Sequence, residues 1–299
     1  MGSRAGHHPA GPDTAVTGPV RRRPAAALGR LVRTAAAAGA ARSLLAALSA
    51  SPLGHSSSWR RPNHRGQPVS LLEGPAVVLA GALATTTAAR LPPRLRLAAL
   101  AAGVGSAAVG RFDDMYGRGE VRGLRGHVAA LGRGRLSTGV AKVVGIGGSG
   151  LVAAALARPS GRAKDPVLAG AVVAGTANLV NLFDLRPGRA IKGALLVGLP
   201  VWAAPGSGGL LLAAPLGAAV GVLPADLGER TMLGDAGANG LGALLGLGLV
   251  TGASRLRLGV LALVLTALTV TSEVVSFSVL VERVPALRQL DHLGRRSPG

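Results

Sequence analysis

The feature that most constrains this chain is a succession of long apolar segments separated by short polar loops. A helix that crosses a bilayer needs about 20 mainly apolar residues. The segments that approach or meet this requirement are 28–50, 69–89, 95–110, 137–157, 166–183, 190–205, 209–224, 237–251 and 257–281. They predict an all-α fold, a polytopic transmembrane helical bundle of about eight to nine spans with short loops. The first segment is the weakest because Arg30, Arg33 and Arg42 interrupt it, and it could instead lie in the membrane interface.

The composition agrees with a membrane-embedded chain. Charged residues make up 15 % of the sequence and hydrophobic residues 48 %, with a mean hydropathy of +0.42. Soluble domains usually have about 25 % charged residues. The sequence contains no cysteine, which excludes disulfides, thiolate metal sites and a cysteine nucleophile.

The net charge of +20 raises the alternative of nucleic-acid binding, in which Lys and Arg neutralise phosphates and aromatic rings stack on bases. Aromatic residues are only 2 % of this chain, and its basic residues lie between the apolar segments. Basic loops facing anionic lipid explain the charge better. We therefore expect no nucleic-acid partner.

The chain divides into one membrane domain with two polar ends. Residues 1–27 read as a disordered basic tail, 28–281 as the transmembrane domain and 282–299 as a C-terminal tail. If every segment crosses, one side receives 51–68, 111–136, 184–189, 225–236 and the C-terminal tail. This side carries more Lys and Arg, so the positive-inside rule makes it cytoplasmic. The basic N-terminal tail would then lie outside, unless the first segment does not span.

The few carboxylates gather on that same side. The chain has only 13 Asp and Glu residues, and acidic residues contribute little to topology. Their clustering is therefore independent of the basic-residue count and suggests a divalent cation site, with solvated loop acids as the alternative. The carboxylates on this side are Asp113, Asp114, Glu120, Asp184, Asp226, Glu229, Asp235, Glu282 and Asp291.

Three polar motifs carry candidate chemistry. Asp113 and Asp114 directly follow an apolar segment, where oxygen ligands suit Mg²⁺, although a helix cap with local Arg pairing is the alternative. Asn178, Asn181 and Asp184 share one helical stripe, which should face a protein cavity or form interhelical hydrogen bonds.

The third motif is the glycine-rich stretch 233–242. Backbone N–H groups at a helix N-terminus can bind an anion, and Asp235 beside them offers a metal ligand. The same glycines would also allow tight helix packing.

These motifs, in this order, resemble those of the polyprenyl-phosphate N-acetylhexosamine-1-phosphate transferases, which include the phospho-MurNAc-pentapeptide translocase. That family has a DD pair, an NxxNxxDGxDGLA stretch and a GDxGSxxLG stretch. The matching residues are Asp113 and Asp114; then Asn178, Asn181, Asp184, Gly188 and Ala190; then Gly234, Asp235, Gly237, Leu241 and Gly242. Residues 61–66, with Pro68 and Gly74, resemble the family's earlier RxNxRG motif, so the resemblance covers about residues 55–283.

The resemblance implies an enzyme of the bacterial cytoplasmic membrane with its active face in the cytoplasm. It would transfer a sugar-1-phosphate from a UDP-sugar to a polyprenyl phosphate, in the synthesis of cell-envelope polysaccharide or peptidoglycan precursors. Asp113, Asp114 and Asp235 would be catalytic, with Mg²⁺ held by Asp235 and Asp114 and with Mn²⁺ as the alternative metal. The implied substrate-binding residues are Asn178, Asn181, Asp184, Arg186, Arg189, Arg65 and Arg122. A homodimer is an arrangement that the resemblance leaves open.

The sequence also departs from the family pattern. Pro187 replaces the second Asp of the DGxDG stretch, Ala238 replaces the Ser after GDxG, and the His-rich cytoplasmic loop is reduced to His292 in the segment after Glu282. These departures keep open a non-catalytic family member that binds lipid-linked precursors or acts as a membrane scaffold. A transporter or flippase is the third class. It would place carboxylates at mid-membrane, whereas most acids of this chain lie in the loops of one side.

Overall fold

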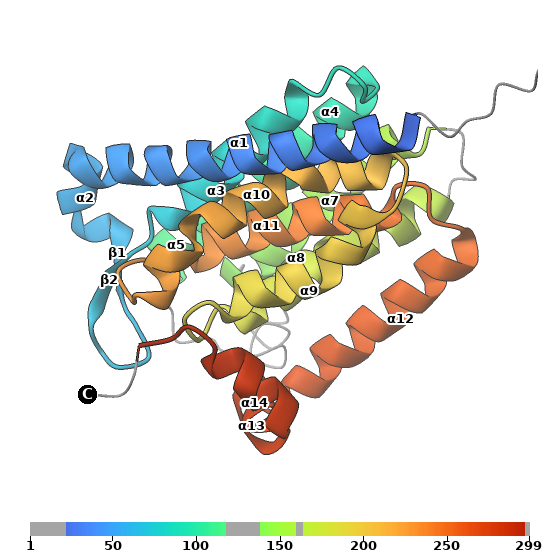
Figure 1. The fold of residues 1–299 in the computed structure, drawn as a ribbon. Helices are drawn as coiled ribbons and strands as arrows, with labels where there is room; N and C mark the ends of the chain where they lie inside the picture. The colour runs from blue at the N-terminus through green and yellow to red at the C-terminus, as the bar shows by residue number, and fades with distance from the viewer. Residues whose placement is uncertain (1–21, 118–137, 160–163, 297–299) are drawn as a thin grey trace, which may run out of the picture.

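The computed structural model describes residues 22–117, 138–159 and 164–296. Within these residues the chain is mainly a bundle of helices that run side by side (Figure 1). In chain order the helices are α1 (Arg22–Ala50), α2 (Pro52–His55), the 3-10 turn η2 (Ser57–Trp59), α3 (Glu73–Thr86), α4 (Pro93–Leu100), the π-helical turn η3 (Ala101–Gly105), α5 (Ser106–Tyr116), α7 (Thr138–Ala157), α8 (Lys164–Phe183), α9 (Arg189–Ala203), α10 (Ser207–Leu227), α11 (Gly234–Val250), α12 (Arg255–Ser272), α13 (Phe277–Arg283) and α14 (Pro285–His292).

Six helical stretches in the described residues are long and apolar enough to cross a membrane, which is consistent with a multi-pass membrane protein. They are Ala25–Ala50, Pro93–Tyr116, Thr138–Ala157, Asp165–Phe183, Ser207–Leu227 and Arg255–Ser272. All six correspond to predicted segments, including the first and weakest one. The last, α12, diverges from the bundle in Figure 1, and only 6 % of its most apolar window is buried inside the protein.

The other three predicted segments form shorter helices. The segments 69–89, 190–205 and 237–251 contain α3, α9 and α11, which have 14, 15 and 17 residues. At 1.5 Å per residue, 14 residues extend only about 21 Å, whereas the hydrocarbon core is about 30 Å thick. A count of eight to nine complete spans therefore stays a prediction.

Helix α11 forms the centre of the bundle. All of its residues except Asp235 are buried, and it packs against α3, α5, α8 and α10. A Cβ atom on Gly237 would lie 2.5 Å from the Cα of Gly74, and one on Gly242 would lie 2.7 Å from the Cα of Ala177. Glycine at these positions allows the backbones to approach closely. The glycine-rich sequence thus places the first turn of α11, with Asp235, among its neighbours.

The structure is consistent with the predicted all-α bundle, and residues 60–70 add one short non-helical feature. This region forms a small antiparallel hairpin of β1 (Arg60–Pro62) and β2 (Pro68–Ser70), in which Arg61 pairs with Val69. The turn is organised by Asn63, whose side-chain oxygen accepts hydrogen bonds from the backbone N–H groups of Arg65 at 2.9 Å and Gln67 at 3.0 Å. Such local side-chain bonds stabilise turns in a polar loop.

The helix limits differ from both predicted ends of the membrane domain. Helix α1 begins at Arg22, inside the predicted tail 1–27, whose residues 1–21 lie outside the described residues. The predicted span 257–281 ends earlier, because α12 stops at Ser272 and α13 begins at Phe277. The carboxylate of Glu273 follows the last turn of α12, where the helix dipole disfavours a negative charge. The predicted tail 282–299 contains the end of α13 and the whole of α14.

Candidate functional site

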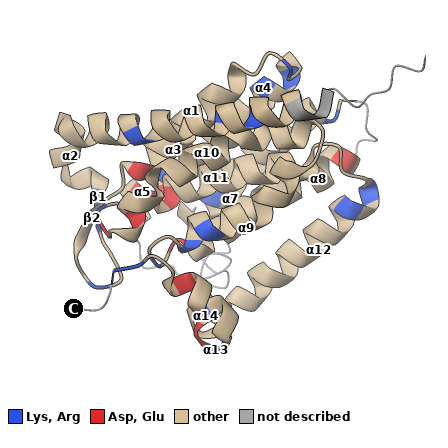
Figure 2. Cartoon of the chain, in the orientation of Figure 1, with Lys and Arg blue, Asp and Glu red and all other residues tan. Residues whose placement is uncertain are grey.

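The carboxylates gather at the end of the bundle that holds the hairpin and the C-terminal end of α5 (Figure 2). Asp113 and Asp114 lie in the last turn of α5, and Asp235 lies in the first turn of α11. The two helices meet closely because residue 110 is glycine: a Cβ there would be 2.2 Å from the carbonyl oxygen of Asp235. Two motifs more than a hundred residues apart in the sequence are thereby brought together.

Asp114 caps the N-terminus of α11. Its two oxygens accept hydrogen bonds from the backbone N–H groups of Asp235 and Ala236, each at 3.1 Å. A carboxylate at this position also interacts favourably with the helix dipole. The helix cap foreseen as the alternative role of the DD pair is therefore present, although Asp114 caps a different helix from its own.

Two cations complete this carboxylate centre. The ammonium group of Lys142, from α7, lies 2.9 Å from Asp113 Oδ2 and 2.9 Å from Asp235 Oδ1. Arg61, from β1, lies 3.5 Å from Asp114 Oδ1 and 3.7 Å from Asp235 Oδ2. We use "carboxylate centre" below for Asp113, Asp114 and Asp235 with these two cations.

Neither cation was among the predicted site residues. Arg61 begins the motif at 61–66 that carries part of the resemblance, but the motif alone implies no role for it. Its position was a signal for Lys142. Only three of the 33 Lys and Arg residues are lysines. Lys142 is one of the two lysines that lie within a predicted apolar segment, where a charge is costly unless it has a partner. Its partners on α5 and α11 could not be read from the sequence.

A second group of buried acids lies beside this centre. Asp184, Asp226 and Glu73 are 8 %, 2 % and 0 % exposed. Thr231 donates a hydrogen bond to Oε2 of Glu73, while Oε1 of Glu73 and Oδ2 of Asp226 have no hydrogen-bond partner among the described residues. Burial and the charges of Asp226 and Asp235 raise the pKa of Asp184 well above its usual range, although the backbone N–H of Gly234 works in the opposite direction.

A small cavity of about 30 Å³ opens among these groups. Its lining includes Asp184, Asp226 and Thr231, together with the predicted site residue Arg186. A volume of this size holds about one water molecule or one small ion. The structure thus brings Asp184 and Arg186 to the same end of the bundle as the carboxylate centre.

Other predicted substrate-binding residues contact the protein itself. The amide nitrogen of Asn178 donates to Thr269 Oγ1 at 3.2 Å and joins α8 to α12, which is the interhelical alternative considered for that stripe. The Asn181 side chain is half-buried near the end of α8. Arg65 pairs with Glu229 at 3.2 Å. Arg122 lies outside the described residues.

Arg189 was predicted to bind phosphate, but its guanidinium holds the C-terminal segment. Nε and Nη2 donate to the two carboxylate oxygens of Asp291 at 2.8 and 3.0 Å, and Nη1 donates to Ser278 at 2.9 Å. Burial alone would raise the pKa of Asp291, but the hydrogen bonds and charge of Arg189, with Arg295 and Lys192, keep it below its ordinary value. This buried pair explains why the C-terminal segment lies against α9.

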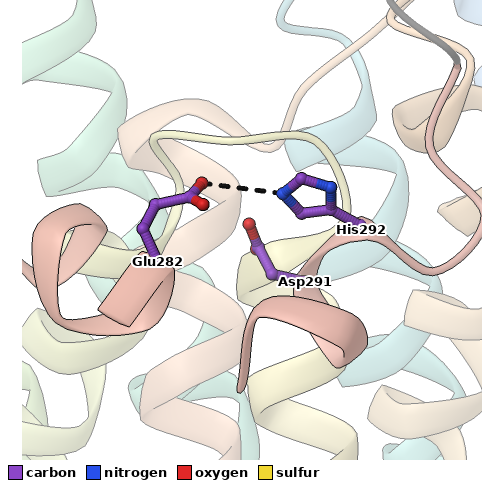
Figure 3. Close-up of side chains that lie close together, drawn as sticks. All are labelled: Glu282, Asp291 and His292. Atoms are coloured by element: carbon purple, nitrogen blue, oxygen red, sulfur yellow. Dashed lines mark ion pairs between the residues drawn. The ribbon is translucent and has the colours of Figure 1, made fainter. Parts of the chain in front are cut away.

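His292 is the one histidine where the resembled family has a His-rich loop, and it belongs to the same C-terminal segment as Asp291. Glu282, Asp291 and His292 lie close together, and His292 Nε2 is 3.6 Å from Glu282 Oε1 (Figure 3). Both oxygens of Asp291 already accept hydrogen bonds from Arg189. A cation here would compete with these arginine contacts, so the cluster is poorly arranged to hold one.

The carboxylate centre fits a divalent cation better. Its donors are carboxylate oxygens, the ligands that Mg²⁺ prefers, and Asp113 and Asp235 are partly accessible, with side chains 17 % and 13 % exposed. Asp114 is more committed to the α11 cap, but each carboxylate oxygen retains a second lone pair. Lys142 and Arg61 could pair with phosphate oxygens once a metal shares the carboxylates.

No family model and no curated protein matches this chain. The assignment of a function therefore depends on the motifs and on the geometry around them.

Proposed function

We propose that the chain is a membrane sugar-1-phosphate transferase, which uses a UDP-sugar as donor and a polyprenyl phosphate as acceptor. The observation that carries the proposal is the meeting of Asp113, Asp114, Asp184 and Asp235, drawn from three separate motifs, at one end of a bundle of membrane-length helices. Their order in the sequence is the one that motivated the resemblance.

The proposed reaction is a phosphoryl transfer. An oxygen of the acceptor phosphate attacks the phosphorus next to the sugar, a new P–O–P linkage forms, and the bond to UMP breaks. Such reactions depend mainly on positioning and on neutralising charge. Mg²⁺ held by Asp235 with Asp113 or Asp114 would neutralise the diphosphate of the donor.

The chain's own residues have distinct roles in this proposal. Lys142 and Arg61 face the site as cations and would bind phosphate oxygens, Arg61 through its guanidinium fork and Lys142 as a point charge. The DD carboxylate that is not on the metal would orient the acceptor; its phosphate is already largely ionised near pH 7, so little proton transfer is needed. Asp184 and Arg186 border the small cavity beside this centre and would contact the donor's nucleotide.

The test is UMP release by the purified protein with polyprenyl phosphate, Mg²⁺ and a panel of UDP-sugars. We expect release that disappears with EDTA and with Asp235→Asn. Asp165→Asn is the matched control, because Asp165 pairs with Arg255 at the opposite end of the bundle. No release across the panel by folded protein would contradict the proposal, and activity retained in Asp235→Asn would contradict the metal assignment.

A non-catalytic precursor-binding protein is the second candidate. The observation in its favour is that Lys142 and Arg61 already balance two of the three carboxylate charges without a metal. The two candidates differ in nucleotide binding: the transferase should bind a uridine nucleotide in a Mg²⁺-dependent way. Calorimetry of UMP binding with and without Mg²⁺ separates them.

A further inference from the structure

A larger cavity, separate from the carboxylate centre, lies between α1, α10 and the hairpin. Its volume is about 500 Å³. Three arginines from three different elements line it: Arg42 near the end of α1, Arg60 on β1 and Arg230 just after α10. We call it the arginine cavity.

The positive charge of the arginine cavity is not neutralised by the described part of the chain. No Asp or Glu lines it, and no ion pair among the described residues joins Arg42, Arg60 or Arg230 to a carboxylate. Glu229, the neighbour of Arg230, is instead engaged by Arg65. Like charges that share a cavity repel unless a counter-ion binds. The cavity is therefore suited to an anion.

Strand geometry separates this cavity from the carboxylate centre. Successive side chains of a strand point to opposite faces. On β1, Arg61 reaches Asp114 and Asp235, whereas Arg60 lines the arginine cavity. The anion expected here is thus distinct from the diphosphate expected at the carboxylate centre.

The position of the arginine cavity indicates the chemical class of the anion. Helices α1 and α10 are both candidate membrane spans, and the cavity lies near the ends of these helices at Ala50 and Leu227. Leu45 and Ala46 from α1 and Pro224 from α10 contribute apolar lining. An anionic group bound at the end of a span beside an apolar wall is the arrangement expected for a lipid headgroup.

We propose that the arginine cavity binds the phosphate headgroup of an anionic phospholipid. The guanidinium groups of Arg42, Arg60 and Arg230 hold the phosphate, because a guanidinium can donate two parallel hydrogen bonds to it. The acyl chains lie along the apolar surface of α1 and α10. This site depends on membrane embedding and not on transferase activity.

The experiment titrates the purified full-length chain in detergent with phosphatidylglycerol, with phosphatidylcholine of the same acyl chains, or with inorganic phosphate. Native mass spectrometry measures bound lipid, and thermal melting measures stabilisation. We expect phosphatidylglycerol to bind and to raise the melting temperature, while the other two compounds do neither. Arg42→Gln and Arg230→Gln should each weaken phosphatidylglycerol binding about fivefold, from about 1 kcal/mol per basic residue near an anionic lipid.

Arg288→Gln is the matched control, since Arg288 is exposed on α14 and lies outside the cavity. Equal affinity for phosphatidylglycerol in the wild type and in both cavity variants would overturn the proposal. Equal stabilisation by phosphatidylcholine would show a site without charge selectivity, and equal stabilisation by inorganic phosphate would show a free-anion site. Either result would overturn it as well. Because the three arginines are exposed at the surface, the single variants should fold.

Discussion

At the scale of single residues, the carboxylate centre shows how a strongly basic chain uses its few acids. Asp114 stabilises the first turn of α11 through two backbone N–H groups and pairs with Arg61. Lys142 lies between Asp113 and Asp235, so these two carboxylates are compensated within the protein. The same charges that stabilise this end of the bundle are those that the proposed phosphoryl transfer requires.

Replacing Lys142 tests whether a charge that stabilises this end of the bundle also takes part in the proposed phosphoryl transfer. Lys142→Gln removes the cation shared by Asp113 and Asp235, so we expect UMP release to fall about a hundredfold, the magnitude typical for loss of one preorganised electrostatic group. Initial rates of UMP release at saturating substrates measure the effect. Arg94→Gln is the control, because Arg94 is an exposed cation just after the loop 87–92, which joins α3 to α4. Equal rates for Lys142→Gln and the wild type would remove Lys142 from the mechanism.

At the scale of elements, small residues determine how closely the helices approach. The backbones of α3 and α11 touch where Gly74 faces Gly237, and α5 meets α11 at Gly110. The turn η2, which leads into β1, is joined to α5 by Arg111, whose guanidinium lies 3.6 Å from the ring centroid of Trp59 and donates to the carbonyl oxygen of Ser58 at 2.9 Å. These contacts hold α5, α11 and the start of the hairpin together at the carboxylate centre.

A methyl group at the α3–α11 contact should therefore be poorly tolerated. Gly237→Ala would place a Cβ 2.5 Å from the Cα of Gly74. We expect destabilisation of about 1–3 kcal/mol, as for other overpacked cores, measured as a lower melting temperature in detergent. Gly147→Ala is the control: this helical glycine has nothing within 4 Å of an added Cβ, so the substitution should be neutral or slightly stabilising. A melting temperature unchanged by Gly237→Ala would show that the two helices can separate without loss of stability.

At the scale of the whole molecule, the chain passes back and forth between two ends of the bundle. The carboxylate centre and the lining of the arginine cavity belong to the end that holds the hairpin. The loops before α4 and α12 lie at the other end (Figure 1). The positive-inside rule predicts that the first end faces the cytoplasm. This orientation is open to a direct test because the chain has no cysteine.

Single cysteines can report the orientation. Ser57 is exposed on the turn η2 near the carboxylate centre, and Ala204 is exposed after α9 at the opposite end. We expect a membrane-impermeant maleimide added to intact cells to label Ala204→Cys, and to label Ser57→Cys only after the membrane is opened. Labelling of Ser57→Cys in intact cells would show the opposite orientation and would place the proposed site outside the cytoplasm.

Docking of the C-terminal segment is a second property of the whole molecule. Asp291→Asn removes the charge that faces Arg189, so we expect faster tryptic cleavage after Arg283 and Arg288, followed by gel electrophoresis. Glu282→Gln, at an exposed residue paired only at 3.6 Å with His292, should change the cleavage rate little. Equal cleavage rates in Asp291→Asn and the wild type would show that this pair does not hold the segment.

The pH dependence of docking has a defined sign. The pKa of Asp291 lies below its ordinary 3.8, so the ionised carboxylate contributes its full stabilisation above that pH. The stabilisation is lost as the pH falls through the lowered pKa. Cleavage by an acid-active protease should accelerate in that range in the wild type, and the acceleration should be smaller in Asp291→Asn.

Apolar length and glycine-rich composition were enough to predict a helical membrane bundle, and all six membrane-length helices fall in predicted segments. The same patterns predicted that Asp113, Asp114, Asp184 and Asp235 share one side, because alternating spans return successive loops to that side. Hydrophobic patterning could not give the docking of α14, since it depends on Arg189, a partner distant in sequence. The β1–β2 hairpin pairs residues that are close in sequence, but its strands are too short to show an apolar alternation.

The partners of individual charged side chains were decided by how the helices pack. Arg189 and Arg186 are three residues apart and were both predicted to bind phosphate. The fold brings Asp291 to Arg189, whereas Arg186 lines the small cavity. Lys142 became a site residue because α7 brings it to α5 and α11. Sequence patterns reveal hydrophobicity and periodicity, which act over a few residues; ion-pair partners are chosen by distances in space that arise only when the helices pack.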